Sequence, residues 1–398
     1  MRILIVSYFF RPDLRPGSFR TSALVDALRD LVPAGSQIDV VTTLSARYDL
    51  PASDVSLTEQ QAGLCIFRIA LPKRQMSMID QTIAFLAFSC GARRRVADRK
   101  YDLVFATSGR LMTAVLGAWI AKGKGAKLYL DIRDIFVENI DEMLPRKIRW
   151  IVKPIFSQLE KWAIERAAKV NLVSEGFSEY FTKRYPLLRF SYLTNGIDDE
   201  FLAVAPTETS RPMLQMRDKM LTVLYAGNLG DGQGLHRIIP RLAKRMESRV
   251  QFVVIGDGNS KRALVEALTS ASVTNVKLIP PVNREELLKA YRVADVLFLH
   301  LNDYAAFKKV LPSKLFEYGA LGKPVWAGVA GYPAKFVRSE IRNAAVFSPC
   351  DVEDAIQAFA NLRLQDLPRP EFIAKYSRSN ISQQLAGDIL ALVKSVPV

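Results

Sequence analysis

Short apolar runs alternate with longer segments of helical periodicity along the first half of the chain. The apolar runs, which we expect to be strands, are residues 3–7, 38–42, 65–69, 103–106, 127–131 and 169–173. The segments of helical periodicity are residues 19–30, 79–99, 111–121 and 147–168. Strands that are apolar throughout are typical of a parallel sheet with helices on both faces. This half of the chain therefore predicts a doubly wound α/β domain.

The alternation stops at residues 196–220, a polar stretch with Pro206 and Pro212 that we interpret as a linker. It then resumes with expected strands at 221–226, 250–255, 276–279, 296–299 and 324–326, and expected helices at 235–245, 261–268, 284–293, 313–320 and 351–361. We therefore expect an α/β fold with two Rossmann-like domains, residues 1–200 and 201–370, and a C-terminal helical segment, residues 371–398, that crosses back to the N-terminal domain. Two such domains in tandem place a ligand in the crevice at the carboxyl ends of both sheets.

Glycine-rich loops follow three of the expected strands. Gly17 lies in the loop after the first strand, residues 227–234 contain four glycines, and Gly256 and Gly258 follow the next strand. Such glycine density is explained by positive φ angles or by a close approach of backbone N–H groups to a phosphate. We interpret residues 227–234 as a phosphate cradle. Gly17 alone fits either a phosphate contact at a helix N-terminus or an ordinary turn.

A second candidate for nucleotide binding is the segment LPSKLFEYGALGKPV, residues 311–325. Ser313 can begin a helix whose N–H groups face a diphosphate, and Glu317 lies one turn later, within reach of a ribose diol. The alternative is that Glu317 and Lys314 are ordinary surface residues of that helix.

The net charge of +15 favours an anionic partner, and its distribution favours a membrane surface. Residues 68–100 contain eight Lys or Arg against two Asp, and residues 146–169 contain seven against two Glu. Both segments mix basic with large apolar residues, which is typical of a membrane-surface patch. The candidates for shallow insertion are Ile79, Ile83, Phe85, Leu86 and Phe88. The alternative is a pair of core helices with solvated basic faces.

No apolar run reaches the length of a membrane span, and Met1 leads directly into a core strand. We therefore expect a cytoplasmic protein that is peripheral on the inner face of the plasma (inner) membrane. The three separated cysteines predict reduced thiols. Two histidines and the lack of a D-x-D triplet predict that neither a metal nor another cofactor is used.

The ordered set of motifs resembles the retaining glycosyltransferases of family 4, which have the GT-B fold. The resemblance extends over essentially all 398 residues, and its closest subset is similar to bacterial enzymes of O-antigen, capsule and exopolysaccharide assembly. It rests on MRILIVSYFFRPDLRPGSFRTSALVDAL (1–28), LYLDIRDIFVEN (128–139), LTNGIDDEF (193–201), LYAGNLGDGQGL (224–235), VVIGDGNSKRAL (253–264), ADVLFL (294–299) and LPSKLFEYGALGKPV (311–325).

This resemblance implies the transfer of a sugar, with retention and without a metal, from a nucleotide-sugar that we expect to be UDP-linked. The basic-apolar segments lie in the half that holds acceptors in this family, and an enzyme docked on a membrane through them would meet a lipid-linked oligosaccharide, whose hydroxyl is the acceptor that we expect. Glu317 matches the glutamate that holds the nucleotide ribose, and the backbone amides of Leu315 and Phe316 match those that face the diphosphate. Pro281 and Val282 match the positions whose backbone groups read the base.

The remaining matches concern the glycine loops and the first domain. Gly227, Gly256 and Gly258 match positions that border the nucleotide. Gly17 matches the glycine loop of the first domain, and Arg133 falls near the histidine that many members place beside the donor sugar.

The chain departs from the family pattern in two places. Asn228 and Gln233 stand where many members carry an arginine and a lysine on the diphosphate, and Lys309 stands where the first glutamate of the E-x7-E element contacts the donor sugar. We therefore expect other cations to stabilise the leaving diphosphate, and Lys308, Lys309 and Lys314 are the nearest candidates in sequence.

Asp131, Arg133, Asp134 and Glu138 form a polar cluster at a strand end of the first domain. Asp131 and Arg133 are candidates for a catalytic role, and Asp134 and Glu138 are candidates for contact with the acceptor. The alternative is that the two aspartates only cap and pair locally. Two other functions stay open: a nucleotide-sugar 2-epimerase of similar fold, and a basic nucleic-acid- or membrane-binding protein. We expect no nucleic-acid partner, because the sequence has neither a binding module nor a basic groove interleaved with aromatic residues.

Overall fold

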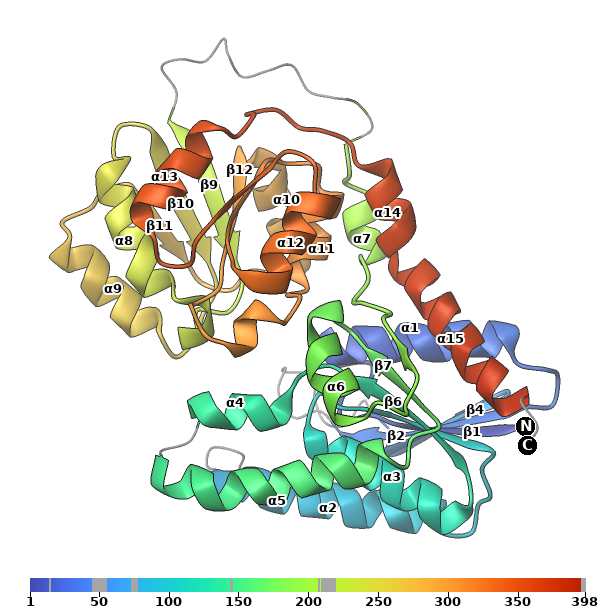
Figure 1. The fold of residues 1–398 in the computed structure, drawn as a ribbon. Coiled ribbons are helices and arrows are strands. Elements are labelled where there is room, and N and C mark those ends of the chain that lie inside the picture. The colour runs from blue at the N-terminus through green and yellow to red at the C-terminus, as the bar shows by residue number, and fades with distance from the viewer. Residues whose placement is uncertain are drawn as a thin grey trace. The chain divides into compact units, whose positions relative to one another are not determined.

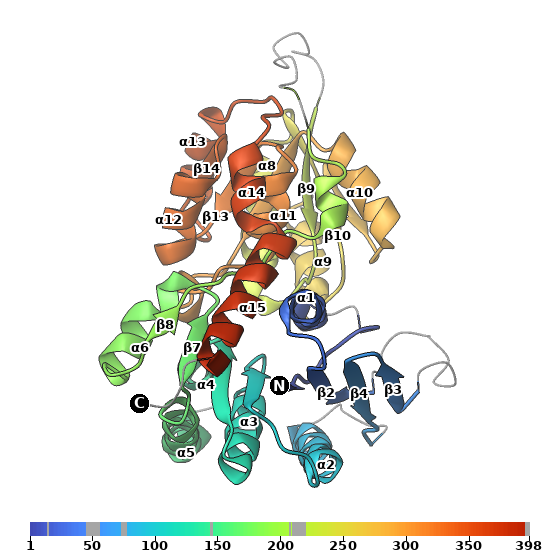
Figure 2. The ribbon, with the colours of Figure 1, turned by 90° about the vertical axis from the view of Figure 1, so that its right-hand side faces the viewer.

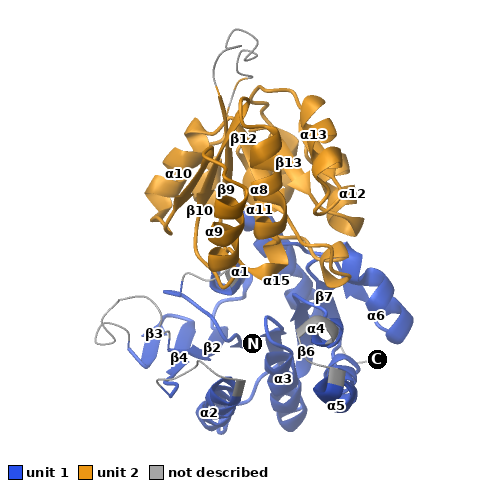
Figure 3. Ribbon diagram, turned by 90° about the vertical axis from the view of Figure 1, so that its left-hand side faces the viewer, with its two compact units in different colours: residues 1–195, 378–398 blue, residues 196–377 orange. Residues whose placement is uncertain are grey.

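The computed structural model describes residues 1–13, 16–44, 56–72, 78–143, 146–206, 208 and 220–394. The chain divides into two compact units: unit 1 contains residues 1–195 and 378–398, and unit 2 contains residues 196–377 (Figure 3). The sequence pattern places the boundaries at 200/201 and 370/371, whereas the units divide at 195/196 and 377/378.

Unit 1 is built on an eight-stranded sheet with the strand order β3-β4-β2-β1-β5-β6-β7-β8. Its strands are β1 (Arg2–Val6), β2 (Gln37–Thr43), β3 (Thr58–Gln61), β4 (Leu64–Ile69), β5 (Leu103–Thr107), β6 (Lys127–Ile132), β7 (Lys169–Leu172) and β8 (Phe190–Ser191). Neighbouring strands are parallel except β3 and β4, which form an antiparallel hairpin at the edge. The sequence pattern misses β3 because all four of its residues are polar and three are exposed.

Helices cover both faces of the unit 1 sheet. They are α1 (Pro16–Leu31), α2 (Met78–Val96), α3 (Leu111–Lys124), α4 (Phe136–Met143), α5 (Arg146–Ile164), α6 (Ser178–Arg184) and α15 (Arg378–Lys394). Helices α2, α3 and α5 lie side by side on one face, and α1 packs against α15 on the other (Figure 2). Leu385 and Ile389 of α15 share a buried cluster with Leu24 and Leu28 of α1. The C-terminal helix is therefore part of the core of unit 1.

Unit 2 contains a six-stranded, entirely parallel sheet with the order β11-β10-β9-β12-β13-β14 (Figure 1). Its strands are β9 (Leu221–Ala226), β10 (Val250–Ile255), β11 (Val276–Ile279), β12 (Val296–His300), β13 (Val325–Gly328) and β14 (Ala344–Phe347). Its helices are α7 (Asp199–Leu202), α8 (Leu235–Arg245), α9 (Lys261–Ser270), α10 (Arg284–Val293), α11 (Lys314–Ala320), α12 (Gly331–Glu340), α13 (Val352–Ala360) and α14 (Pro370–Tyr376). The strand order reverses between β9 and β12, and open sheets of this kind bind ligands at the carboxyl ends beside such a reversal.

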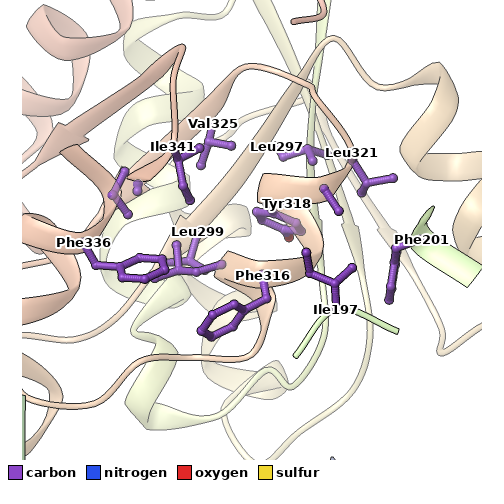
Figure 4. Close-up of a cluster of buried hydrophobic side chains, with 14 of the residues drawn as sticks. Ile197, Phe201, Leu297, Leu299, Phe316, Tyr318, Leu321, Val325, Phe336 and Ile341 are labelled. Atoms are coloured by element: carbon purple, nitrogen blue, oxygen red, sulfur yellow. The ribbon is translucent and has the colours of Figure 1, made fainter. Parts of the chain in front are cut away.

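Two hydrophobic clusters cover the two faces of the unit 2 sheet. Alternate residues of β9 point to opposite faces, so Leu224 belongs to one cluster and Tyr225 to the other. The first cluster joins α10, α11 and α12 to the sheet and includes Phe316 and Phe336 (Figure 4). The second cluster joins α8, α9 and α13, with Trp326 fully buried in it. Unit 2 is therefore a three-layer domain whose carboxyl edge remains available for loops.

The first part of the expected linker, residues 196–206, is instead a packed segment of unit 2. Ile197 and Phe201 are fully buried in the cluster of Figure 4, which a free linker would not allow. Ile197 also pairs with Ser377 in a parallel bridge. The sequence pattern did not predict that this segment is packed, because its two buried residues stand among acidic and small ones. Residues 207 and 209–219 of the expected linker lie outside the described residues.

The expected C-terminal helical segment is two helices, α14 and α15, separated at Ser377. The carbonyl oxygen of Tyr376 accepts a hydrogen bond from the N–H of Ile197 at 2.8 Å. Ser377 has an extended backbone (φ −56°, ψ 141°), which ends the helical ladder. The pairing of the two crossing segments therefore fixes the position of the break.

Candidate functional site

The glycine-rich loop, residues 227–234, follows β9 at the carboxyl edge of unit 2. Gly227 has φ +149° and Gly234 has φ +58°, a region that favours glycine. Gly232 packs against the Phe307 ring so closely that a Cβ atom there would lie 2.7 Å from Phe307 Cζ. A Cβ on Gly227 would overlap the side chain of Lys314. These glycines are therefore required by backbone conformation and by close neighbours.

A second glycine loop follows β10 and crosses the first at very short range. A Cβ atom on Gly256 would overlap the carbonyl oxygen of Gly227, and one on Gly258 would lie 2.5 Å from the carbonyl carbon of Leu229. The N–H of Leu229 donates to the carbonyl of Asp257 at 2.8 Å. The two loops therefore form one continuous backbone surface, which side chains at positions 256 and 258 would disrupt.

Asn228 and Gln233 bond to each other within the glycine-rich loop. Asn228 Nδ2 donates to Gln233 Oε1 at 3.0 Å, and the same oxygen accepts the N–H of Gly230 at 3.1 Å. This neutral pair closes the loop and brings no positive charge to it.

Lys314 brings the positive charge to this loop. Its side chain lies against Gly227, with Nζ 5.8 Å from the centroid of the Tyr225 ring. Among the described residues, no carboxylate forms an ion pair with Lys314. Lys308, by contrast, pairs with Asp303 at 3.0 Å. An anion that enters the loop would therefore meet an ammonium group that is not already neutralised.

Ser313, Leu315 and Phe316, which the sequence also predicts for this site, lie on the turn that begins α11. Leu315 and Phe316 are fully buried, and their N–H groups donate to the carbonyls of Pro312 and Ser313 at 3.0 Å. These two amides are thus already used within the turn. Lys309, which follows the short helix η4 (Ala306–Lys308), is half-buried.

Glu317 lies in an acidic group around Arg284. Burial opposes the charge of Arg284, but the hydrogen bond with Glu200 and the fields of Glu200, Glu317 and Asp198 raise the pKa of Arg284 above its usual value. Arg284 also lies over the Phe201 ring, 4.4 Å from its centroid. The beginning of α10 is thereby attached to α7.

Pro281 and Val282 lie in the loop between β11 and α10, at the same carboxyl edge as the glycine loops. Pro281 is exposed and Val282 is half-buried. The N–H of Gly256 donates to the carbonyl of Ile279 at 2.9 Å, which ties this loop to the second glycine loop. The structure thus collects the nucleotide-binding candidates of unit 2 along the ends of β9, β10, β11 and the turn before α11.

In unit 1, Asp131 is a buried structural carboxylate. Arg20 binds it with two hydrogen bonds of 2.8 and 2.9 Å, and Asn171 Nδ2 donates to it at 2.8 Å. Burial alone would raise the pKa of Asp131, but the field and hydrogen bonds of Arg20 hold it below its usual value. Arg20 also donates to the carbonyls of Leu193 and Thr194. Asp131 therefore links α1 to β6 and β7, and each of its oxygens already accepts a hydrogen bond from a buried partner.

Arg133 and Gly17 lie together at the carboxyl edge of unit 1. A Cβ atom on Gly17 would be 3.0 Å from Arg133 Nη1. Burial, followed by the field of Arg20, lowers the pKa of Arg133 to about 10, so the guanidinium is charged at neutral pH. Asp134 is exposed beside it, and Glu138 is half-buried on α4. The structure therefore brings Gly17, Arg133 and Asp134 together at one edge, whereas Asp131 is buried and bonded to Arg20 and Asn171.

Sequence reasoning assigned no role to His300, the last residue of β12. The structure places its ring 2.7 Å from the carbonyl oxygen of Gln233, beneath the glycine-rich loop. The sequence feature that could have indicated a role for His300 is its position as a polar residue at the carboxyl end of an otherwise apolar strand. Within the described residues, no group of three or more His, Cys, Asp and Glu side chains is arranged to hold a metal ion.

The outer faces of α2, α3 and α5 carry exposed apolar side chains among basic ones. We call this the basic-apolar surface of unit 1. Its eight large apolar residues are 47–71% exposed: Ile79, Ile83 and Leu86 of α2, Trp119 of α3, and Ile148, Trp150, Ile151 and Ile155 of α5. Arg93 stacks over Trp119, 3.8 Å from the ring centroid.

Two of the residues expected to insert into a membrane are core residues. Phe85 is 9% exposed and Phe88 is fully buried, because they occupy the inner face of α2 and contact Tyr8. Residues 73–77 of the first basic segment lie outside the described residues. In the part of the chain that is described, no helix is long and apolar enough to cross a bilayer.

Two family models match the two halves of the chain. Residues 20–191 match the glycosyl transferase 4-like domain, and residues 206–380 match the glycosyl transferases group 1 domain. The fold is similar to that of sucrose-phosphate synthase from Thermosynechococcus elongatus, with a TM-score of 0.72 and 15% identity over 98% of both chains. The expected α/β fold with two Rossmann-like domains of the GT-B class is confirmed.

Two curated relatives match the chain over about half of its length. The chain is 25% identical over 214 residues to the colanic acid biosynthesis glycosyl transferase WcaI of Escherichia coli (strain K12), covering 52% of this chain and 46% of the relative. It is 23% identical over 235 residues to the lipopolysaccharide 1,2-N-acetylglucosaminetransferase of Salmonella typhimurium, covering 54% and 60%. The chain thus spans about half the length of the curated relatives it matches.

Because the two glycine loops cross so closely, we predict that one added methyl group strongly lowers the stability of the fold. Gly256→Ala should lower the free energy of unfolding by about 2–4 kcal/mol, because the added Cβ overlaps a carbonyl oxygen and the backbone has φ +147°. Gly123→Ala is the control: Gly123 lies near the end of α3 with open space around it, so alanine should stabilise the chain by up to about 1 kcal/mol. Chemical denaturation measures both changes. Equal stability of the Gly256→Ala variant and the wild type would contradict the close crossing.

The buried ion pair of unit 1 predicts a structural rather than a catalytic phenotype. Asp131→Asn should cost about 3–5 kcal/mol of stability, because it leaves the Arg20 charge buried without a counter-charge. Replacing both residues by leucine should recover much of that loss, since no isolated charge remains. Thermal unfolding of the single and double variants tests this, and an Asp131→Asn variant with wild-type stability would exclude the structural role.

Proposed function

We propose that this chain, which consists of a glycosyl transferase 4-like domain followed by a group 1 glycosyl transferase domain, transfers a sugar from a nucleotide-sugar to a hydroxyl group. The observation that carries the proposal is the carboxyl edge of unit 2. There two glycine loops cross in backbone contact, and the ammonium group of Lys314, which pairs with no carboxylate of the described residues, lies against them.

The chemistry of this edge suits a nucleoside diphosphate. Glycine loops let backbone N–H groups approach phosphate oxygens without side chains in the way. Lys314 would stabilise the negative charge that grows on the diphosphate as the glycosidic bond breaks, which is electrostatic catalysis. Because Asn228 and Gln233 form a neutral pair, Lys314 would carry a larger share of that task than it would beside an arginine and a lysine.

The nucleoside would extend from this diphosphate along the same edge. Glu317 would accept hydrogen bonds from the ribose hydroxyls, and Pro281 and Val282 would offer backbone groups to the base. The resemblance of the sequence favours a UDP-linked donor. Lys309 would stand on the sugar side, where its charge suits an oxygen-rich or anionic group of the donor.

We propose that transfer proceeds with retention and without a metal. The leaving diphosphate oxygen would take the proton of the acceptor hydroxyl, so no protein nucleophile is required. In unit 1, Arg133 and Gly17 form a cationic edge that suits oxygen groups of a substrate, with Asp134 and Glu138 as candidates for acceptor contact. Asp131 takes no part, because Arg20 and Asn171 occupy its oxygens.

We further propose that the protein docks on an anionic membrane surface and meets a lipid-linked acceptor there. The basic-apolar surface of unit 1 supports this proposal, because exposed tryptophans and isoleucines combined with Lys and Arg suit the interface of an anionic bilayer. The names of the two relatives refer to colanic acid biosynthesis and to lipopolysaccharide. A lipid-linked oligosaccharide is the acceptor class that we propose to test.

A donor screen tests the enzymatic proposal. Purified protein is incubated with a panel of UDP-, GDP- and dTDP-sugars, and the release of nucleoside diphosphate is measured with and without EDTA. The proposal expects one sugar class to be consumed at a rate that EDTA leaves unchanged. Recovery of an epimerised nucleotide-sugar, with no nucleoside diphosphate released, would favour the epimerase instead.

Lys314 and Lys308 form a matched pair for the charge argument. Lys314→Ala should weaken UDP binding about 10–100-fold, because one charge-assisted contact to the diphosphate is lost. Lys308→Ala should change it less than about 3-fold, since Lys308 is exposed and already pairs with Asp303. Calorimetric titration with UDP distinguishes the two variants. Equal weakening by both would show that only general positive charge matters, and no weakening by Lys314→Ala would remove Lys314 from the site.

Membrane docking predicts a phenotype for one exposed tryptophan. Trp150→Asp should weaken binding to phosphatidylglycerol vesicles at least about tenfold, because Trp150 is 71% exposed on the basic-apolar surface. Val293→Asp is the control: Val293 is 74% exposed on α10 of unit 2, outside that surface, and should leave vesicle binding unchanged. Co-sedimentation at low and high salt, with phosphatidylcholine vesicles as reference, measures both. Wild-type protein that ignores anionic vesicles at low salt would end the membrane proposal.

A further inference from the structure

His300 connects two loops at the carboxyl edge of unit 2 through both of its ring nitrogens. It ends β12 and is 1% exposed. Nδ1 lies 2.7 Å from the carbonyl oxygen of Gln233, and Nε2 lies 2.9 Å from the backbone nitrogen of Cys350. Because the amide of Cys350 can only donate, Nε2 must accept. The proton therefore resides on Nδ1, which donates to Gln233, and the ring is neutral.

Two aromatic rings and a glycine pack around the His300 ring. The Phe298 ring lies parallel to it at 6.3 Å, and the Phe347 ring lies at 6.0 Å with an interplanar angle of 26°. Gly328 lies against the ring so closely that a Cβ there would overlap His300 Cδ2. Burial lowers the pKa of His300 to about 4, so the neutral form persists at neutral pH.

The bond from His300 completes a set of attachments beneath the glycine-rich loop. Asn302 donates from its backbone to the carbonyl of Gly232 at 2.8 Å and from its side chain to that of Asp231 at 3.2 Å. Tyr304 Oη donates to the Asp231 carboxylate at 2.5 Å. These bonds hold the first part of the turn, and the bond from His300 holds Gln233, the residue before the left-handed Gly234.

Gln233 is the residue on which the shape of the loop depends. Its side-chain oxygen accepts from both Asn228 and Gly230, so fixing its backbone also fixes the far side of the loop. A loop that binds a diphosphate mainly through its backbone gains affinity from being held in the binding shape beforehand.

We propose that His300 is a positioning residue that holds the glycine-rich loop in the shape that receives the diphosphate of the donor. The inference rests on the proposed function, which assigns this loop to the donor. His300 itself lies beneath the loop and acts through Gln233. To hold the loop, His300 must donate a hydrogen bond from Nδ1 to the carbonyl of Gln233. The bond that Nε2 accepts from Cys350 fixes the orientation of the ring and its tautomer.

Three substitutions separate the two bonds. His300→Asn keeps an N–H near the position of Nδ1, His300→Gln keeps an acceptor near the position of Nε2, and His300→Phe keeps only the ring. We expect UDP to bind about tenfold or more weakly to the Phe and Gln variants, and within about 3-fold of wild type to the Asn variant. The full chain is used, with calorimetric titration of UDP as the readout.

A stability control distinguishes positioning from general damage. Asn275 is buried at the opposite end of the sheet, where its side chain donates to the carbonyls of Ala243 and Val250. Asn275→Ala should lower the melting temperature without weakening UDP binding more than about 3-fold. Two results would overturn the proposal. The first is that Asn275→Ala weakens UDP binding as much as His300→Gln does at the same loss of melting temperature. The second is that His300→Gln and His300→Phe bind UDP with wild-type affinity.

Hydrogen exchange without any ligand keeps the inference testable on its own. Amides of residues 228–234 should exchange about tenfold faster in His300→Gln than in His300→Asn, because only the former loses the bond to Gln233. Equal exchange in these variants would overturn the inference. If wild-type protein fails to bind UDP, or Glu317→Ala binds UDP like wild type, the proposed donor site fails instead, and the exchange result still decides whether His300 fixes the loop.

Discussion

The close crossing of two backbone segments governs the carboxyl edge of unit 2. Gly256 passes so near the carbonyl of Gly227 that no side chain fits between them, and the N–H of Gly227 donates to the carbonyl of Ile255 at 2.8 Å. This contact sets the distance between the ends of β9 and β10. It also leaves a bare strip of backbone against which Lys314 can lie. The rest of the candidate site depends on it, because a side chain at either glycine would separate the loops and cover that strip.

Shape and charge come from different residues at this edge. The glycines, the neutral pair of Asn228 and Gln233, and His300 define the shape of the loop without adding charge. Lys314 supplies charge from a separate element, the start of α11. In unit 1 the division is similar: the buried pair of Arg20 and Asp131 holds the strands together, which leaves the neighbouring Arg133 at the edge. Buried charges are kept paired, and the groups left for a ligand are placed against glycine backbone.

The sequence predicted the architecture because apolar strands and amphipathic helices have different periods, and that signal is strong in long segments. It failed where the signal is short or mixed. Strand β3 is polar, and Ile197 and Phe201 are two buried residues within a polar stretch. The helix α2 could not be divided into its faces from composition, so Phe85 and Phe88 were assigned to a membrane although they face the core. The glycine loops were located correctly at strand ends, but packing against Phe307, the reason for Gly232, depends on tertiary contacts. The buried partner of Asp131 could not be identified from the sequence, because Arg20 is 111 residues away.

Hydrogen exchange of the full chain, with and without saturating UDP, tests directly whether the crossed glycine loops hold the donor diphosphate. We predict that UDP slows the exchange of the amides in residues 227–234 and at the start of α11, residues 313–317. We predict no change in α2 and α5 of unit 1. UDP that binds tightly while leaving both of these segments of unit 2 unprotected would contradict the assignment of the crossed glycine loops and Lys314 to the donor diphosphate.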